Sequence, residues 1–185
     1  MNIYREFWDV PVDQVPHKTG AASVMDCSDI QDVLTHLNVT LAGKSVVDVG
    51  CGTGRMAQLC GGDYRGFDVA PGMVEYATGH GVNASLIDSP ADLTGVTAGI
   101  YLCLSVFTHV PRELRQEFLA VFAANTKELL ADILDGGEGG SIGAWYADET
   151  GFEDDLDAAG FVDRRSYKRG SPDGAGHRYY HAYRA

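Results

Sequence analysis

The sequence predicts an α/β fold in which a mostly parallel sheet is covered by helices on both faces. Apolar, strand-like runs alternate with helix-like patterns along the chain, and the connections between them are short. A β-branched run at residues 46–49 leads into a turn with glycine at alternate positions, as a buried strand does when it turns sharply into a helix. Residues 98–104 are nearly all apolar, which is typical of a strand in the middle of a sheet.

The length of 185 residues is sufficient for a single domain with one hydrophobic core. We expect residues 1–43 to form an N-terminal helical segment, or lid, packed on the core, and residues 44–185 to form the main domain. No apolar stretch has the length of a membrane span, and the N-terminus is charged where a signal peptide needs apolar residues. The four cysteines form neither a CxxC pair nor a metal-ligand spacing, so we expect reduced thiols, no metal and a cytoplasmic location.

The formal net charge of −12 is unevenly distributed along the chain. Residues 163–185 contain six Lys and Arg against two Asp, so the first 162 residues hold all of the negative excess. An acidic body disfavours sequence-independent binding of nucleic acid, because phosphate contacts need clustered cations. The basic C-terminal stretch is compatible with an anionic partner. Alternatively, its cations protect exposed sheet edges from pairing with other chains.

The first half of the chain is expected to contain three strands and three helices. Ser28 and Gln31 form a capping-box pattern before an amphipathic helix that is expected to end near Gly43. The next elements are a strand at residues 45–49, a helix at 53–60, a strand at 64–68, a helix that begins near Pro71, and a strand at 84–87.

In the second half, a long helix is expected to begin at Pro111. Its buried stripe comprises Leu114, Phe118, Val121, Phe122, Leu129 and Ile133. Residues 141–146 are then expected to form the fifth strand, and Thr150 and Glu153 form a second capping box before a helix that ends at Gly160. The last two strands, residues 161–168 and 177–183, flank a turn-rich segment. We therefore expect a hairpin in which one strand runs antiparallel to the rest of the sheet.

The turn after the first strand, Asp-Val-Gly-Cys-Gly-Thr-Gly at residues 48–54, favours a ligand with a cationic end. Phosphate-binding glycine loops present N–H groups to an anion, and Asp48, two residues before the first glycine, would repel one. S-adenosylmethionine carries an ammonium and a sulfonium, so it suits this turn better than a dinucleotide. Arg55 also stands where a dinucleotide fingerprint has its third glycine. A tight strand-to-helix turn without a ligand is the structural alternative.

Four further stretches follow the glycine turn in a specific order. They are Gly-Phe-Asp-Val-Ala-Pro-Gly-Met-Val-Glu-Tyr-Ala at residues 66–77, Leu-Ile-Asp at 86–88, Leu-Ser-Val-Phe-Thr-His-Val-Pro at 104–111 and Ala-Gly-Phe at 159–161. With these motifs, the chain from about residue 44 to its end resembles class I S-adenosylmethionine-dependent methyltransferases, especially the small type 11 and type 12 members. The resemblance implies a Rossmann-like three-layer sandwich with a seven-stranded, mostly parallel sheet whose last strand is antiparallel.

The resemblance also implies a donor site at the carboxyl edge of the sheet, with S-adenosylhomocysteine as product and no metal. Asp48 is expected to hold the ammonium, directly or through water, and Asp68 to accept both ribose hydroxyls. The segment after Asp88 is one residue longer than is usual in the family, so Asp88 and Asp92 are both candidates for binding the adenine amino group. Asp88 is the favoured one. The alternative role for Asp68 is to cap a helix without binding a ligand. The alternative role for Met73 is to pack in the core. The other donor-binding candidates are Gly50, Cys51, Gly52, Val69, Met73, Ser89, Leu104 and Ser105.

Methyl transfer is an in-line displacement at the sulfonium methyl, so alignment can supply much of the rate. His109, in the loop after the fourth strand, is the candidate general base, because histidine titrates near neutrality. Alternatively, His109 orients its loop or caps the next helix. The acceptor pocket is expected to use the His109 loop together with Tyr4, Phe7, Trp8, His17, Trp145 and Tyr146.

The sequence thus predicts an S-adenosylmethionine-dependent methyltransferase that acts on an O, N or C atom of a small molecule. The fourth strand lacks the Asn/Asp-Pro-Pro-aromatic sequence of enzymes that methylate DNA-base amines, which makes nucleic acid a less favoured acceptor. One alternative is a methyltransferase of RNA or protein that uses the basic C-terminal hairpin. A second alternative is a catalytically silent cofactor-binding subunit, and a third is a nicotinamide-dependent oxidoreductase.

Overall fold

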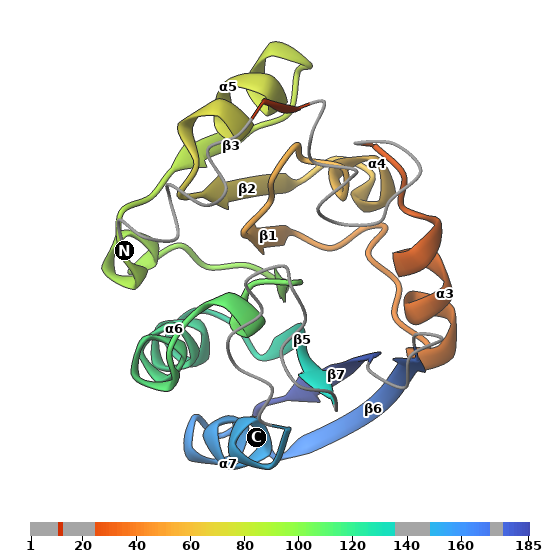
Figure 1. The fold of residues 1–185 in the computed structure, drawn as a ribbon, viewed down its shortest axis with the longest axis vertical. Coiled ribbons are helices and arrows are strands. Elements are labelled where there is room, and N and C mark those ends of the chain that lie inside the picture. The colour runs from red at the N-terminus through yellow and green to blue at the C-terminus, as the bar shows by residue number, and fades with distance from the viewer. Residues whose placement is uncertain (1–10, 13–24, 136–148, 171–175) are drawn as a thin grey trace.

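The computed structural model describes residues 11–12, 25–135, 149–170 and 176–185. Within these residues, seven strands form one sheet in the order β3-β2-β1-β4-β5-β7-β6 (Figure 1). The strands are β1 (Val46–Val49), β2 (Tyr64–Asp68), β3 (Ala84–Leu86), β4 (Ile100–Cys103), β5 (Glu128–Asp135), β6 (Asp163–Gly170) and β7 (Gly176–Tyr183). Only β7 is antiparallel to its neighbours, pairing in this way with both β5 and β6. The prediction of a mostly parallel seven-stranded sheet with a reversed last strand is confirmed.

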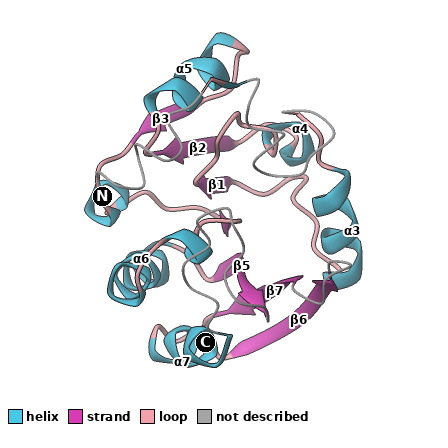
Figure 2. Cartoon of the chain, in the orientation of Figure 1, coloured by secondary structure: helices cyan, strands magenta, loops and turns pink. Residues whose placement is uncertain are grey.

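Helices cover both faces of the sheet, which gives the three layers expected (Figure 2). Helices α3 and α4 lie on one side of the strands, and α6 and α7 lie on the other (Figure 1). The helices are α3 (Ser28–Leu37), α4 (Ala57–Cys60), α5 (Pro71–Gly79), α6 (Arg112–Asn125) and α7 (Glu149–Ala158), with short 3-10 helices at Pro90–Leu93 and Phe107–His109. None of the helices in the described ranges has both the length and the apolar character to cross a membrane.

The layer formed by α6 and α7 buries an aromatic cluster against the sheet. Phe107, Phe118 and Phe122 pack together, with ring centroids 5.8–6.5 Å apart. Phe152 of α7 contacts both Phe107 and Tyr180 of β7, at 5.4 and 5.3 Å between centroids. All five rings are at most 3% exposed, so this cluster joins α6, α7 and the strands into one core.

Helix α3 belongs to the core of the opposite face. Its residues Ile30, Val33 and Leu37 are at most 2% exposed and pack with the strand residues Leu102 and Leu130. Removing α3 would therefore expose apolar sheet surface. The remainder of the expected lid, including Tyr4, Phe7, Trp8 and His17, lies outside the described residues.

The largest error of the sequence analysis concerns β5. The helix expected to continue through Leu129 and Ile133 ends at Asn125, and both residues are fully buried in the strand Glu128–Asp135. A strand buried on both faces is continuously apolar, so periodicity cannot distinguish it from a buried helix. The fifth strand is therefore β5, and residues 141–146 lie outside the described part of the chain.

The start and end of α3 also differ from expectation. Ser28 is already inside the helix, and its N–H is capped by the Asp26 carboxylate at 2.9 Å, so the predicted Ser28–Gln31 capping box is wrong. The helix ends at Leu37, because Asn38 adopts the left-handed conformation (φ 54°) that terminates helices. The second predicted capping box depends on the Thr150 side chain, which is not among the side chains that the structure describes.

Candidate functional site

The carboxyl ends of the parallel strands meet at one edge of the sheet, where ligands bind in open α/β folds. The glycine turn follows β1 at this edge, Asp68 ends β2, and Ser105 lies two residues beyond β4. Because β1 pairs with both β2 and β4, these three segments are neighbours (Figure 1). The sequence motifs therefore come together as predicted.

The glycine turn needs glycine for two different reasons. Gly50 has φ +76°, and a Cβ there would lie 2.2 Å from Cγ2 of Val106, so the turn is packed tightly against the loop after β4. Gly52 has φ +53°, but nothing lies within 4 Å of the position that its Cβ would take. The turn thus presents bare backbone to open space at Gly52, where a ligand can approach closely.

Asp68 joins the second motif to the first. Its Oδ2 accepts the Gly52 N–H at 2.8 Å, and its Oδ1 accepts the Ala70 N–H at 2.9 Å. The residue is 8% exposed, and burial raises the pKa of its carboxyl although the backbone N–H groups act to lower it. A carboxylate held rigidly beside the open backbone of Gly52 is positioned to accept hydroxyl groups of a ligand.

Asp48 lies beneath the turn rather than on its surface. It is 2% exposed, and its Oδ2 accepts a hydrogen bond from the Tyr64 hydroxyl at 2.6 Å. Burial raises the pKa of Asp48 to about 6, with the Tyr64 hydrogen bond opposing this rise. Tyr64 was not singled out from the sequence, where it was only the first residue of the second strand.

Cys51 is a buried spacer in the turn. It is 5% exposed, and burial raises the pKa of its thiol well above the usual range, so the thiol is protonated and not a nucleophile. A Cβ at Gly66 would lie 2.8 Å from Sγ of Cys51, so β2 needs glycine at this point. The sequence alone does not show this requirement, because it arises from the contact between β2 and the glycine turn.

The two aspartates that compete for the adenine role have different surroundings. The Asp92 carboxylate accepts the N–H groups of Asp88 and Ser89 at 2.8 and 2.9 Å in a capping box, and these bonds lower its pKa. Asp88 is exposed at the edge of the sheet, just after β3. Val69 is half-buried and Met73 is 3% exposed, so Met73 is mainly part of the core.

The loop after β4 contains the remaining sequence-predicted residues. Leu104 is half-buried, and His109 ends the short 3-10 helix Phe107–His109 with its side chain partly exposed. Ser105 adopts φ +59°, a strained conformation for a residue other than glycine. Its N–H donates to Oδ1 of Asp132 at 2.5 Å, which fixes the loop to β5.

Asp132 and His177 are further polar residues at this edge, and the sequence analysis did not identify them. Asp132 is fully buried on β5, and its Oδ2 lies 2.5 Å from Nδ1 of His177 on β7. One signal was available, since Asp132 is the only charged residue in the apolar run between Glu128 and Asp135. A charge inside a buried strand needs a partner, and the partner is 45 residues away.

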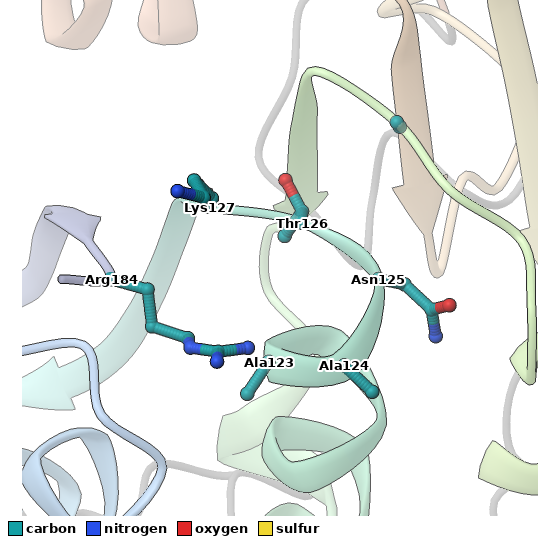
Figure 3. Close-up of a pocket in the computed structure, with 7 residues that line it drawn as sticks. Ala123, Ala124, Asn125, Thr126, Lys127 and Arg184 are labelled. Atoms are coloured by element: carbon teal, nitrogen blue, oxygen red, sulfur yellow. The ribbon is translucent and has the colours of Figure 1, made fainter.

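A shallow pocket lies at the opposite edge of the sheet (Figure 3). It is lined by Ala98, Ala123, Ala124, Asn125, Thr126, Lys127 and Arg184. These residues precede β4 and β5 or follow β7, so the pocket is remote from the glycine turn. The acceptor-pocket candidates Trp145 and Tyr146 lie outside the described residues. No group of three or more His, Cys, Asp or Glu side chains in the described ranges is arranged to hold a metal ion.

Comparisons with known proteins agree with this geometry. Residues 47–127 match the family described as methyltransferase domain. Magnesium protoporphyrin IX methyltransferase from Synechocystis PCC 6803, solved with bound S-adenosylmethionine, is 20% identical, with a TM-score of 0.76 over 100% of this chain and 96% of that chain. The 1,6-didemethyltoxoflavin-N1-methyltransferase of Burkholderia thailandensis, solved with S-adenosylhomocysteine, is 18% identical, with a TM-score of 0.64 over 84% of this chain and 76% of that chain. No curated protein sequence matches this chain.

Proposed function

We propose that this protein binds S-adenosylmethionine at the glycine turn and transfers its methyl group to a small molecule, and the match of residues 47–127 to the methyltransferase domain family supports this proposal. The observation that carries the proposal is the contact between Gly52 N–H and Asp68 Oδ2 at 2.8 Å, beside the open space at Gly52. This contact supports ribose binding, because it holds a carboxylate next to backbone that a ligand can approach. The family match over the same residues supports a methyl donor as the ligand.

The surrounding residues fit the parts of this donor. Asp68 accepts the ribose hydroxyls, and the backbone of Leu104 and Ser105 lies where a carbonyl can meet the ammonium. Asp48 is buried, so it acts on the cationic end through its charge or through water rather than through an exposed surface. Asp88 is assigned the adenine amino group, because it is exposed just after β3, whereas Oδ2 of Asp92 is engaged in the capping box of the following 3-10 helix.

Val69 and Ser89 complete the proposed adenine side, with Met73 supporting it from the core, while Gly50, Cys51 and Gly52 form the wall along the methionine portion. The donor supplies the leaving group, so the chain's own contribution is to align the acceptor with the sulfonium methyl. His109 lies in the loop after β4, at the edge where the acceptor would enter. No metal is proposed.

The acceptor is proposed to be small because several cations of the basic hairpin are paired with carboxylates of the protein itself. Lys168 and Arg178 both pair with Asp135, at 3.2 and 2.7 Å, and Arg164 pairs with Asp157 of α7. Cations engaged in this way are poorly placed to bind RNA phosphates, which disfavours the RNA alternative. The two methyltransferases compared above are named for small-molecule substrates. The free, buried state of all four cysteines supports a cytoplasmic location.

Calorimetry with S-adenosylhomocysteine tests donor binding. Asp68→Ala removes two hydrogen bonds to a charged group, which contribute roughly 1.5–3 kcal/mol each, so affinity should fall by about a hundredfold or more. Asp63→Ala is the matched control, because Asp63 is exposed at the amino end of the same strand. A change below about threefold in Asp68→Ala would contradict the ribose placement.

A screen of metabolites and RNA with radiolabelled S-adenosylmethionine tests transfer. We expect label in a small molecule, with turnover that is insensitive to salt. Label in RNA with a steep salt dependence would favour the hairpin alternative. Donor binding without turnover on any extract would favour a catalytically silent subunit, and tight binding of NAD with no binding of S-adenosylhomocysteine would favour an oxidoreductase.

A further inference from the structure

A buried carboxylate connects the donor loop to a histidine at the same edge of the sheet. Asp132 is fully buried on β5, with Oδ1 accepting the Ser105 N–H and Oδ2 bound to Nδ1 of His177, each at 2.5 Å. The side chain of His177 is 34% exposed. One oxygen of Asp132 therefore fixes the loop assigned to the donor, and the other fixes the orientation of a partly exposed imidazole.

The topology places His177 at the same edge of the sheet as the loop after β4. Because β7 runs antiparallel to β5, its first residues lie at the carboxyl end of β5, and His177 pairs with Leu134 (Figure 1). The parallel neighbour β4 ends at Cys103, directly before the donor loop. The Asp132 carboxylate therefore connects His177 directly to Ser105.

We propose that His177, oriented by Asp132, takes the proton from the acceptor during methyl transfer. This inference rests on the proposed function. The nucleophilic atom of the acceptor forms a bond to the methyl carbon, the carbon–sulfur bond breaks with its electron pair going to sulfur, and the acceptor proton moves to Nε2 of His177. Asp132 is a positioning residue, because its hydrogen bond keeps the proton on Nδ1 and leaves Nε2 as the basic atom.

The charged and titratable groups around His177 come from four elements. Asp132 of β5 and Asp29 of α3 favour the protonated ring, Arg169 of β6 disfavours it, and Tyr179 of β7 lies beside it with ring centroids 6.1 Å apart. Burial opposes protonation, but Asp132 outweighs it, so the pKa of His177 is raised. A bound sulfonium nearby would lower this pKa again, which favours the neutral, basic form of the ring when the donor is present.

Nuclear magnetic resonance of the histidine-labelled protein tests the position of His177. The pKa of each imidazole is measured with S-adenosylhomocysteine bound and with S-adenosylmethionine bound, since these ligands differ at the sulfur by one methyl and one positive charge. A cation about 6 Å away should lower the pKa of His177 by roughly one to two units relative to the neutral sulfide. His181 is the internal control, because it makes the same kind of pair with Glu128, at 2.8 Å, toward the opposite edge of these strands.

The outcomes separate this inference from the proposed function. If both ligands bind and the pKa of His177 differs between them while that of His181 does not, the inference is supported. If both ligands bind and His177 has the same pKa with each, or His109 alone responds, His177 is not the base and the proposed function stands. If neither ligand binds by calorimetry, the proposed function fails and this inference fails with it.

Asp132→Asn tests the positioning role separately. Loss of the negative charge should lower the pKa of His177, and the ¹⁵N shifts of its neutral ring should change from one tautomer to a mixture of two. Glu128→Gln is the matched variant, since it alters the carboxylate of the His181 pair and should leave the His177 signals unchanged. Unchanged His181 signals in Asp132→Asn would show that the fold is retained. An unchanged pKa and tautomer of His177 in that variant would overturn the role of Asp132.

Discussion

Asp48→Asn is expected to stabilise the empty protein while weakening donor binding. Asp48 is 2% exposed, and burial raises the pKa of its carboxyl from 3.8 to about 6, which corresponds to about 3 kcal/mol of stability lost when it ionises. Between about pH 4 and pH 6 the folded state binds more protons at Asp48 than the unfolded state does. The contribution of Asp48 to the free energy of unfolding therefore falls as pH rises through this window and is constant above it.

An asparagine at this position stays neutral at every pH and can still accept the Tyr64 hydrogen bond through its amide oxygen. Urea denaturation should show Asp48→Asn to be more stable than the natural protein by about 1–3 kcal/mol at pH 7.5, with nearly equal stabilities at pH 4.5. Asp63→Asn is the control, because it changes an exposed carboxylate at the amino end of β2. A stability difference for Asp48→Asn that is the same at both pH values would refute the assigned burial cost.

The same variant reports on the ligand. If the Asp48 charge attracts the cationic end of the donor, affinity for S-adenosylhomocysteine at pH 7.5 should fall by about tenfold or more in Asp48→Asn. In the natural protein, affinity should weaken as pH falls below about 6, because Asp48 becomes neutral there. Equal affinities of the two proteins at pH 7.5 would show that the buried charge does not act on the ligand.

Three other variants test contributions to stability. Gly50→Ala should cost about 2–4 kcal/mol, because the added Cβ would lie 2.2 Å from a methyl of Val106 and φ is positive. Gly52→Ala, with nothing within 4 Å, should cost only about 1–2 kcal/mol in urea denaturation yet strongly reduce donor affinity in calorimetry. Asp155→Asn should cost about 3–5 kcal/mol in the same denaturation assay, because Arg115, whose side chain is 1% exposed, loses the carboxylate that it contacts at 2.6 Å. A cost below about 1 kcal/mol would show that water or another group compensates the Arg115 charge.

Local chemistry in the sequence was sufficient to predict the glycine turn and the elements around it. The strand Tyr64–Asp68 has the bounds expected, and the donor motifs after β1, β2 and β4 lie at one edge. The closing hairpin and its reversed strand were also predicted correctly. These features depend on short-range requirements, such as positive φ at Gly50 or an acidic residue at the end of a buried strand.

β5 shows where sequence patterns were insufficient. Its residues Leu129 and Ile133 are apolar at a spacing that also suits a helix, and only the strands on either side show that the run is extended. The consequences reach the site, because Asp132 was assigned to the wrong element. Its partner His177 could not be found without the register that aligns β5 with β7.

The sequence by itself determined that a strand ends in a glycine turn with a carboxylate before it, that a second carboxylate follows the next strand, and that the chain alternates strands with helices. Each of these depends on backbone conformations and solvent preferences of residues close together in the chain. Only the tertiary structure decided that Asp68 holds Gly52, that Asp132 joins Ser105 to His177, and that Asp135 pairs with Lys168 and Arg178. Those contacts depend on strand register and on the order of strands in the sheet, which bring together side chains that are distant in sequence.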